Sequence, residues 1–272
     1  MQMQPGRLRL EGKVAIVTGA GSSGPGVGTG KATSILFAQE GAKVLLVDRE
    51  TGAAEETLAE IEAGGGTASV FRADVTSADD CAAMAEAATE RYGALHVLFN
   101  NVGISGPGSP TTVEEDVWDR VLDVNLKSMM LTTKYVAPKM IESGGGSIIN
   151  VSSIVGVRAG SGGASIPYAA SKSGIIGMTA NMAVHLGRDN VRVNCIAPGH
   201  LYTPMVAGRM SEEMRDLRRR AGPLGTEGNA WDIAWANVFL ASDESRWISG
   251  VVLPIDAGLL SATPLAMFPH LQ

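Results

Sequence analysis

The chain has 272 residues, of which 45% are hydrophobic and 18% charged, a composition typical of a globular protein. Its formal net charge of −6 argues against a nucleic-acid partner or an anionic membrane surface as a partner. No run approaches the roughly 18 uninterrupted apolar residues that a membrane span needs, and residues 1–10 lack the apolar run of a secretory signal, so a cytoplasmic location is expected.

Short apolar runs alternate along the chain with longer segments of helical pattern. Strands are predicted at 14–17, 44–47, 68–71, 95–99, 147–151, 191–196 and 251–255. Helices are predicted between them at 31–40, 53–61, 78–92, 113–141 (broken near Asp123), 168–186, 211–220 and 229–242. Apolar strands that alternate with helices indicate a parallel sheet covered on both faces. Right-handed crossovers then give a doubly wound sheet. We therefore predict an α/β fold in which residues 1–272 form a single Rossmann domain with a seven-stranded parallel sheet.

Tyr168 and Lys172 are spaced as Y-x-x-x-K at the start of a predicted helix, with Ser153 upstream. Residues four apart lie on the same face of a helix, so the phenol is expected beside the cation. An ammonium group favours the phenolate and lowers the pKa of the phenol. A tyrosine tuned in this way acts as an acid or base near neutral pH, which is what interconversion of an alcohol and a ketone requires.

A glycine-rich segment from Thr18 to Gly30 separates the first predicted strand from the first predicted helix. Glycine allows the backbone to approach a pyrophosphate closely, and a helix N-terminus offers free N–H groups and the positive end of a dipole. We therefore predict a dinucleotide site here, and its expected contacts are Gly19, Ser23, Gly28, Thr29 and Gly30.

Asp48 ends the second predicted strand, about twenty residues after this segment. A carboxylate in that position binds the ribose hydroxyls and repels a 2′-phosphate, which favours NAD over NADP. Arg49 follows directly and could pair with a phosphate, which would weaken that preference.

The next two strands also end in polar residues or turns. Asp74 and Val75 end the third strand, where a side chain could meet the adenine, although a turn or cap role fits Asp74 equally. The fourth strand ends in Asn100, Asn101, Val102 and Gly103. Because ligands of such sheets bind beyond the carboxyl ends of the strands, Asn101 and Gly103 are expected to line the cofactor.

Taken together, the motifs resemble those of the short-chain dehydrogenase/reductase family over nearly the whole chain. The stretches that carry the resemblance are Thr18-Gly19 with Gly28-Thr29-Gly30, Asp48, Asn100 to Gly103, Asn125, Asn150-Val151-Ser152-Ser153, Tyr168-Ala169-Ala170-Ser171-Lys172, and Pro198-Gly199 with Thr203. Their order and spacing are similar to that family throughout.

The resemblance implies a catalytic tetrad of Asn125, Ser153, Tyr168 and Lys172. Tyr168 looks like the general acid/base, and Ser153 looks like the residue that hydrogen-bonds the substrate oxygen, with its neighbour Ser152 the weaker candidate. Lys172 looks like the residue that binds the nicotinamide ribose and lowers the pKa of Tyr168. Asn125 resembles the member that holds a water between the lysine and solvent.

The same resemblance assigns the nicotinamide end of the cofactor. Tyr168 and Lys172 are implied to contact the cofactor, and Pro198, Gly199 and Thr203 look like the segment that clamps the nicotinamide. The cofactor performs the hydride chemistry while the protein supplies position and electrostatics.

One departure from the family pattern lies in the glycine segment. The usual pattern is T-G-x-x-x-G-x-G, whereas eight residues separate Gly19 from Gly28 here, so the loop is about five residues longer. Gly28 fits the start of the helix better than Gly24 or Gly26 does. The longer loop leaves open which of Ser22, Ser23, Gly28 and Thr29 contacts phosphate or ribose.

Variable segments are expected to select the substrate. They are residues 154–167, the substrate loop at about 200–222, and the apolar tail 259–272, which is expected to pack against its own domain or a neighbouring subunit. The polar candidates near the pocket are Arg158, His200 and Tyr202, although such residues are more often solvated or structural than substrate contacts. The resemblance implies a homotetramer.

The cysteines and histidines indicate no metal site. Cys81 and Cys195 lie far apart without a C-x-x-C pattern, so buried thiols are expected rather than a disulfide or structural zinc. The four histidines, His96, His185, His200 and His270, show no ligand spacing, and His96 is expected to be a packed core residue.

Three functions remain in view. The first is an NAD-dependent oxidoreductase that interconverts a small-molecule secondary alcohol and a ketone. The second is an NADPH-dependent carbonyl or 3-oxoacyl-carrier-protein reductase, against which Asp48 argues. The third is a non-catalytic nucleotide-sensing protein, which the intact Asn125, Ser153, Tyr168 and Lys172 disfavour.

Overall fold

The computed structural model describes residues 8–159, 165–208 and 210–271. Seven parallel strands form one sheet in the order β3-β2-β1-β4-β5-β6-β7. The strands are β1 Val14–Thr18, β2 Lys43–Asp48, β3 Thr67–Arg72, β4 Val97–Asn100, β5 Gly146–Val151, β6 Val191–Pro198 and β7 Val252–Ile255. The order reverses direction at β1, which confirms the predicted doubly wound Rossmann sheet.

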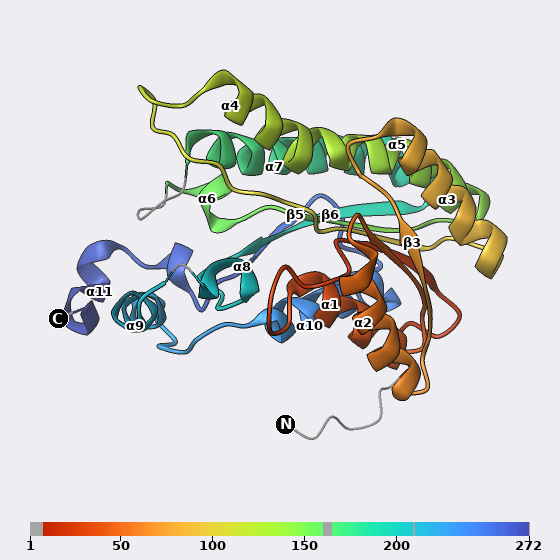
Figure 1. The fold of residues 1–272 in the computed structure, drawn as a ribbon, viewed down its shortest axis with the longest axis horizontal. Coiled ribbons are helices and arrows are strands. Elements are labelled where there is room, and N and C mark those ends of the chain that lie inside the picture. The colour runs from red at the N-terminus through yellow and green to blue at the C-terminus, as the bar shows by residue number, and fades with distance from the viewer. Residues whose placement is uncertain (1–7, 160–164, 209, 272) are drawn as a thin grey trace.

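Helices cover both faces of the sheet (Figure 1). The lower layer consists of α1 Thr29–Gln39, α2 Thr51–Ala63 and α10 Ala230–Ala241. The upper layer consists of α3 Ala78–Tyr92, α4 Glu115–Leu122, α5 Ser128–Glu142 and α7 Ile166–Leu186. At the left of the view lie α6 Ile154–Val157, α8 Pro204–Ala207, α9 Glu212–Ala221 and α11 Pro264–Leu271.

The pleat of β1 explains why its sequence is apolar without interruption. Ala15 and Val17 point into the core shared with α1 and α10, whereas Val14 and Ile16 point into the core shared with α3 and α5. Because successive side chains alternate between faces and both faces are covered, every residue of β1 is buried. The edge strands β3 and β7 are only partly buried.

The predicted helix at 113–141 is continuous through Asp123 instead of broken there. A π-helical segment, η1 Asp123–Lys127, joins α4 to α5. One wide turn of this kind re-aims side chains without ending the helix, and such turns occur frequently at functional sites. Here the turn contains Asn125, whose side chain is fully buried.

Three short helices were not anticipated, namely α6, α8 and α11. The tail packs against its own domain, as one of the two expectations stated, because Met267 of α11 is buried and Arg220 of α9 donates to the carbonyl of His270 at 3.0 Å. Leu265 and Phe268 of the same helix remain exposed. The remaining short helical segments are η2 Gly187–Asp189, η3 Asp243–Ser245 and η4 Leu259–Ser261.

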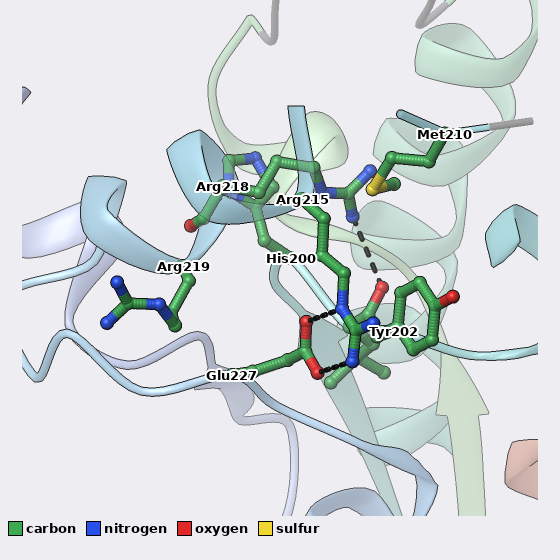
Figure 2. A pocket seen from close by; sticks show the side chains of 8 residues that line it. His200, Tyr202, Met210, Arg215, Arg218, Arg219 and Glu227 are labelled. Atoms are coloured by element: carbon green, nitrogen blue, oxygen red, sulfur yellow. Dashed lines mark hydrogen bonds and ion pairs between the residues drawn. The ribbon is translucent and has the colours of Figure 1, made fainter. Parts of the chain in front are cut away.

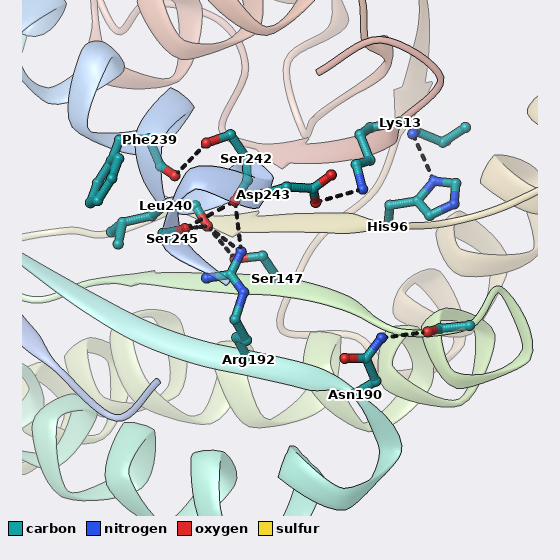
Figure 3. Close-up of polar contacts among 12 residues, drawn as sticks. Lys13, His96, Ser147, Asn190, Arg192, Phe239, Leu240, Ser242, Asp243 and Ser245 are labelled. Atoms are coloured by element: carbon teal, nitrogen blue, oxygen red, sulfur yellow. Dashed lines mark hydrogen bonds and ion pairs between the residues drawn. The ribbon is translucent and has the colours of Figure 1, made fainter. Parts of the chain in front are cut away.

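Arg192, near the amino end of β6, ties this strand to the end of α10 (Figure 3). Its guanidinium donates to the carbonyls of Leu240 at 2.8 Å, Ser242 at 3.2 Å and Ile248 at 3.3 Å. A cation is favoured beside the unpaired carbonyls at a helix C-terminus, so Arg192 has a structural role.

His96 is half-buried at the start of β4 and accepts a hydrogen bond at Nδ1 from the backbone N–H of Val14 at 3.0 Å (Figure 3). Burial, with the nearby charge of Lys13, lowers its pKa, so the neutral ring that can accept this bond is favoured. Both cysteines, Cys81 and Cys195, are free and buried as expected.

Within the described ranges, no helix combines the length and apolarity needed to cross a membrane.

Candidate active site

The turn from β1 into α1 places glycine backbone against glycine backbone. Gly19 adopts a φ of +65°, and a Cβ on Gly30 would overlap the carbonyl oxygen of Gly19. Gly28 is the N-cap and Thr29 the first residue of α1, so the helix begins two residues before the predicted start at 31 and directly after Gly28, the glycine that the sequence favoured for this position. A loop that tolerates no side chain at this point matches a turn that must let a phosphate approach the helix N-terminus.

A hydrogen bond between Ser22 and Gly28 joins the two ends of the extra residues in the glycine loop. The N–H of Gly28 donates to Oγ of Ser22 at 2.9 Å, which bridges the two ends of the excursion. Ser23 is exposed, and Gly26 approaches Pro204 of α8. Ser22, which the sequence left open, is therefore held by the loop itself.

Asn101, just beyond β4, connects the start of the loop with the start of α1. Its Nδ2 donates to the carbonyls of Thr18 at 3.2 Å and Gly19 at 3.1 Å, and its Oδ1 accepts from the hydroxyl of Thr29 at 2.6 Å. Asn101 therefore shapes the turn, while its Oδ1 keeps a further lone pair.

Asp48 lies at the end of β2 beside the same turn. Its Oδ2 accepts from the N–H of Gly21 at 3.0 Å, and its Oδ1 accepts from the N–H of Glu50 at 3.1 Å. Each oxygen keeps a further lone pair, so the carboxylate is oriented and still able to accept from ribose hydroxyls. Arg49 points its guanidinium at Glu50, 3.5 Å away, in an exposed pair.

Asp74 performs the turn role that was one of its two alternatives. Its Oδ1 accepts from both the N–H and the hydroxyl of Thr76, at 2.9 Å and 2.6 Å. The hydrogen bonds from Thr76 hold the pKa of Asp74 below its usual value. Val75 follows it and is buried.

Lys172 is buried at the centre of the candidate site. Its Nζ donates to the carbonyl of Val151 at 2.7 Å, and burial lowers its pKa to about 8. A Cβ on Gly103 would lie 3.4 Å from this Nζ and 3.5 Å from Oδ1 of Asn125. Three segments distant in sequence thus meet around Gly103, at the carboxyl end of the sheet where ligands of this fold bind.

The π-helical turn aims Asn125 into this centre. Its Oδ1 accepts from the N–H of Ile104 at 2.7 Å, and its Nδ2 donates to the carbonyl of Ile104 at 2.9 Å and to Oγ of Ser171 at 3.0 Å. Ser171 in turn donates to the carbonyl of Tyr168 at 2.8 Å. Asn125 therefore fixes the loop after β4 against the first turn of α7.

The phenol of Tyr168, on α7, lies beside the hydroxyl of Ser153, which follows β5. Burial raises the pKa of its phenol, and hydrogen bonding with the Ser153 hydroxyl lowers that pKa by a smaller amount. The expected lowering by Lys172 is wrong for this structure, because the Lys172 ammonium bonds the Val151 carbonyl and lies 5.6 Å from the centre of the Tyr168 ring. Desolvation of the phenolate therefore dominates.

The two neighbouring serines differ in their hydrogen-bond partners. Ser152 is buried and donates to the carbonyl of Lys172 at 2.6 Å, so its hydroxyl is committed to the protein. Ser153 accepts from the N–H of Val155 at 3.2 Å as the N-cap of α6, and its hydroxyl is also hydrogen-bonded with the phenol of Tyr168.

Pro198 ends β6, and Gly199 follows where a Cβ would lie 2.6 Å from Asp256. Thr203 is the residue before α8, and its hydroxyl makes no capping bond. The segment predicted to clamp the nicotinamide therefore packs closely against Asp256 where the chain leaves β6.

Of the polar substrate candidates, two face a separate pocket and one is exposed. His200 and Tyr202 lie with Arg215 and Arg218 in the pocket of Figure 2, whereas Arg158 is exposed. A cavity of about 310 Å³ continues from there beneath α9. The variable segment 154–167 contains residues 160–164 and the predicted substrate loop at about 200–222 contains residue 209, and these lie outside the described residues.

Sequence reasoning assigned no individual role to Thr18, Gly21 and Ser171, which orient Asn101, Asp48 and Asn125 respectively. Only Ser171 carried a local signal, because it stands three residues after Tyr168 on one helix. In the described ranges, no group of His, Cys, Asp and Glu side chains is placed to hold a metal ion.

Comparisons with known proteins place the chain among oxidoreductases. A family model described as enoyl-(acyl carrier protein) reductase matches residues 25–260. The 3-oxoacyl-[acyl-carrier-protein] reductase FabG of Thermotoga maritima is 41% identical over 253 residues, which are 93% of this chain and 100% of that protein.

Solved structures agree with the sequence comparisons. A short-chain dehydrogenase/reductase from Burkholderia xenovorans superposes with a TM-score of 0.89 at 40% identity, covering 94% of this chain and 99% of the other. A 7α-hydroxysteroid dehydrogenase in complex with NADH and 7-oxo glycochenodeoxycholic acid superposes with a TM-score of 0.86 at 34% identity, covering 94% and 98%. The likeness therefore extends over nearly the whole of each chain.

Proposed function

The chain belongs to the short-chain dehydrogenase/reductase family and is an oxidoreductase, and from this premise we propose that it is an NAD-dependent dehydrogenase that interconverts a secondary alcohol and a ketone. The observation that carries the proposal is the meeting of Lys172, Asn125 and Gly103 beside the facing pair Tyr168 and Ser153. When bound, NAD accepts or returns the hydride.

The residues present fit a nicotinamide dinucleotide. The Gly19–Gly30 contact leaves backbone bare at the N-terminus of α1, where a pyrophosphate would bind. Asp48 is oriented to accept from ribose hydroxyls and would repel a 2′-phosphate, which supports NAD. The bare backbone at Gly103, beside the Lys172 ammonium, suits the nicotinamide ribose.

In this proposal Tyr168 moves the proton. During alcohol oxidation its phenolate oxygen accepts the proton of the substrate hydroxyl, and during ketone reduction its phenol donates it. Ser153 donates a hydrogen bond to the substrate oxygen and stabilises the charge that develops there. Lys172 binds the nicotinamide ribose, and Asn125 fixes the loop beside the lysine and holds a relay water.

A second function, NADPH-dependent reduction of a 3-oxoacyl carrier protein, is favoured by one observation. The FabG protein of Thermotoga maritima is 41% identical over its full length. Against this stands Asp48, and the arginines of α9 offer little free charge to an acidic carrier because Arg215 and Arg219 pair with Glu227 and Asp216.

Titration with NADH and NADPH, followed by tryptophan fluorescence, tests the proposal without a substrate. The four Trp residues supply the signal. We expect NADH to bind about 100-fold more tightly than NADPH, because the Asp48 carboxylate gains ribose hydroxyls in one case and meets a phosphate charge in the other. Tighter binding of NADPH would replace the proposal with the reductase function, and binding of neither would exclude both.

We also propose that the protein is a homotetramer. Helix α7 is largely apolar, yet Val184 near its end is 79% exposed, and Trp247, ahead of the edge strand β7, is 90% exposed. Apolar groups of this size gain free energy when a second subunit covers them. Light scattering coupled to gel filtration should give four times the 28.2 kDa chain mass, and a monomeric mass would overturn this proposal.

A further inference from the structure

The segment 200–202 connects Gly199 at the end of β6 with Thr203 at the start of α8. It lies along a second loop, since the N–H of Tyr202 donates to the carbonyl of Gly228 at 2.8 Å and Leu201 pairs with Gly228 as an isolated parallel bridge. The backbone that leads into Thr203 is therefore fixed from one side by the loop before α10.

From the other side, Arg215 of α9 clamps the same segment (Figure 2). Its guanidinium lies over the Tyr202 ring, 3.7 Å from the centre, and makes two parallel hydrogen bonds of 2.7 Å to the carboxylate of Glu227. We call these three residues the Tyr202–Arg215–Glu227 latch. Only a planar guanidinium can stack on a ring and present this fork together.

Helix α9 depends on such polar contacts for its position. None of its residues is buried, so little apolar packing holds it to the domain. Arg218 adds a bond from its Nη2 to the carbonyl of Leu201 at 3.3 Å, and its own carbonyl lies 3.4 Å from Nδ1 of His200. The contacts of Arg215 with Tyr202 and of Arg218 with Leu201 and His200 tie α9 to segment 200–202, while Arg215 also ties the helix to Glu227 in the loop before α10.

The latch is partly shielded from water, with 34% of the Arg215 side chain and 29% of the Glu227 side chain exposed. The Glu227 pKa is lowered, first by hydrogen bonding to Arg215, which is consistent with a charge-assisted pair rather than two solvated ions. Glu212 is the only other acid within ion-pair distance of Arg215 among the described residues, at 3.6 Å, and it is exposed.

We propose that Arg215 and Glu227 are positioning residues for the nicotinamide end of the cofactor, acting through Tyr202 on the segment that leads to Thr203. This inference rests on the proposed function. The turn at Gly30 and Asp48 holds the adenosine end independently, on the other side of the sheet's switch point. Loss of the latch should therefore weaken recognition of one end of the dinucleotide and leave the other end intact.

The test compares NADH with ADP-ribose, which lacks the nicotinamide. In Arg215→Met, which keeps the aliphatic stem but removes the fork, we expect the Kd of NADH to rise about tenfold, and kcat to fall about as much, because a displaced segment no longer orders the reacting ring. The Kd of ADP-ribose should stay within about twofold of wild type. Arg215→Lys keeps the positive charge but not the forked guanidinium, so its Kd for NADH and its kcat should lie between those of wild type and Arg215→Met.

Arg219→Met is the matched control, since Arg219 is on the same helix and pairs with Asp216 inside it. Glu227→Gln should reproduce Arg215→Met, and the double variant should lose no more than either single one because the residues act as one unit. Lower thermal stability with unchanged NADH affinity would show a merely structural latch and overturn the inference. Equal weakening of NADH and ADP-ribose would overturn it as well. If wild type binds neither compound, it is the proposed function that fails.

Discussion

Tyr168→Phe is expected to lower kcat by a factor of roughly 10³ to 10⁴ while NADH binds as in wild type, because the phenol oxygen is the group that exchanges the substrate proton. The ring keeps its packing, since the substitution removes one oxygen from a site where Ser153 is the only hydrogen-bonding side chain found to shift the phenol pKa. Steady-state oxidation of a panel of secondary alcohols, with NADH affinity from fluorescence, measures both quantities.

Tyr135→Phe provides the matched control, because Tyr135 lies on α5 outside the site and should keep full turnover. Turnover of Tyr168→Phe within about tenfold of wild type would remove Tyr168 from the role of general acid/base. Parallel loss of NADH binding would instead point to a positioning role.

The pH dependence of turnover follows from the same group. Burial raises the Tyr168 pKa above its ordinary value, so the neutral phenol predominates at pH 7 in the cofactor-free protein. Alcohol oxidation needs the phenolate, so kcat/KM for the alcohol should rise with pH. Ketone reduction needs the neutral phenol, so kcat/KM for the ketone should fall only at high pH. The buried Lys172, whose pKa burial lowers to about 8, is a second group of the site that loses its proton as the pH rises.

The strands were predictable because each is an apolar run with both faces covered. Ile16 and Val17 face opposite cores and are both fully buried, so the pattern is continuous and needs no knowledge of partners. The pairing of Tyr168 and Lys172 on one helix was equally local, as residues four apart share a face. Local sequence periodicity was therefore enough to predict the sheet and the helix that holds Tyr168 and Lys172.

What escaped prediction depends on long-range contacts. The π-helical turn at Asn125 is matched to Ile104 and Ser171, which lie 21 and 46 residues away. The direction of the Tyr168 pKa depends on burial and on where the Lys172 ammonium points, neither of which spacing specifies. Segments 200–202, α9 and the loop at Glu227 show no shared periodicity, so the latch appears only once the chain is folded.

Gly30→Ala is expected to reduce NADH affinity by more than about 100-fold, because its methyl group would overlap the Gly19 carbonyl and lie 2.8 Å from Nδ2 of Asn101. The backbone of Gly19 cannot move aside as the end of a flexible side chain can. The turn and the start of α1 must therefore move apart, which displaces α1 from the proposed pyrophosphate site. Fluorescence titration measures the affinity, and circular dichroism establishes that the sheet has still formed.

Gly24→Ala, in the same loop, is the matched control and separates the two parts of the glycine segment. A Cβ there would have only Pro204 within 4 Å, at 3.9 Å, so no clash arises and affinity should stay within about twofold of wild type. The expected contrast follows from the bond between Ser22 and Gly28, which joins the two ends of the added residues. If both variants bound NADH equally well, the Gly19–Gly30 contact would not be the pyrophosphate site. If both lost binding, the added residues would themselves belong to the cofactor site, and the extension would be a functional element rather than an excursion that the turn tolerates.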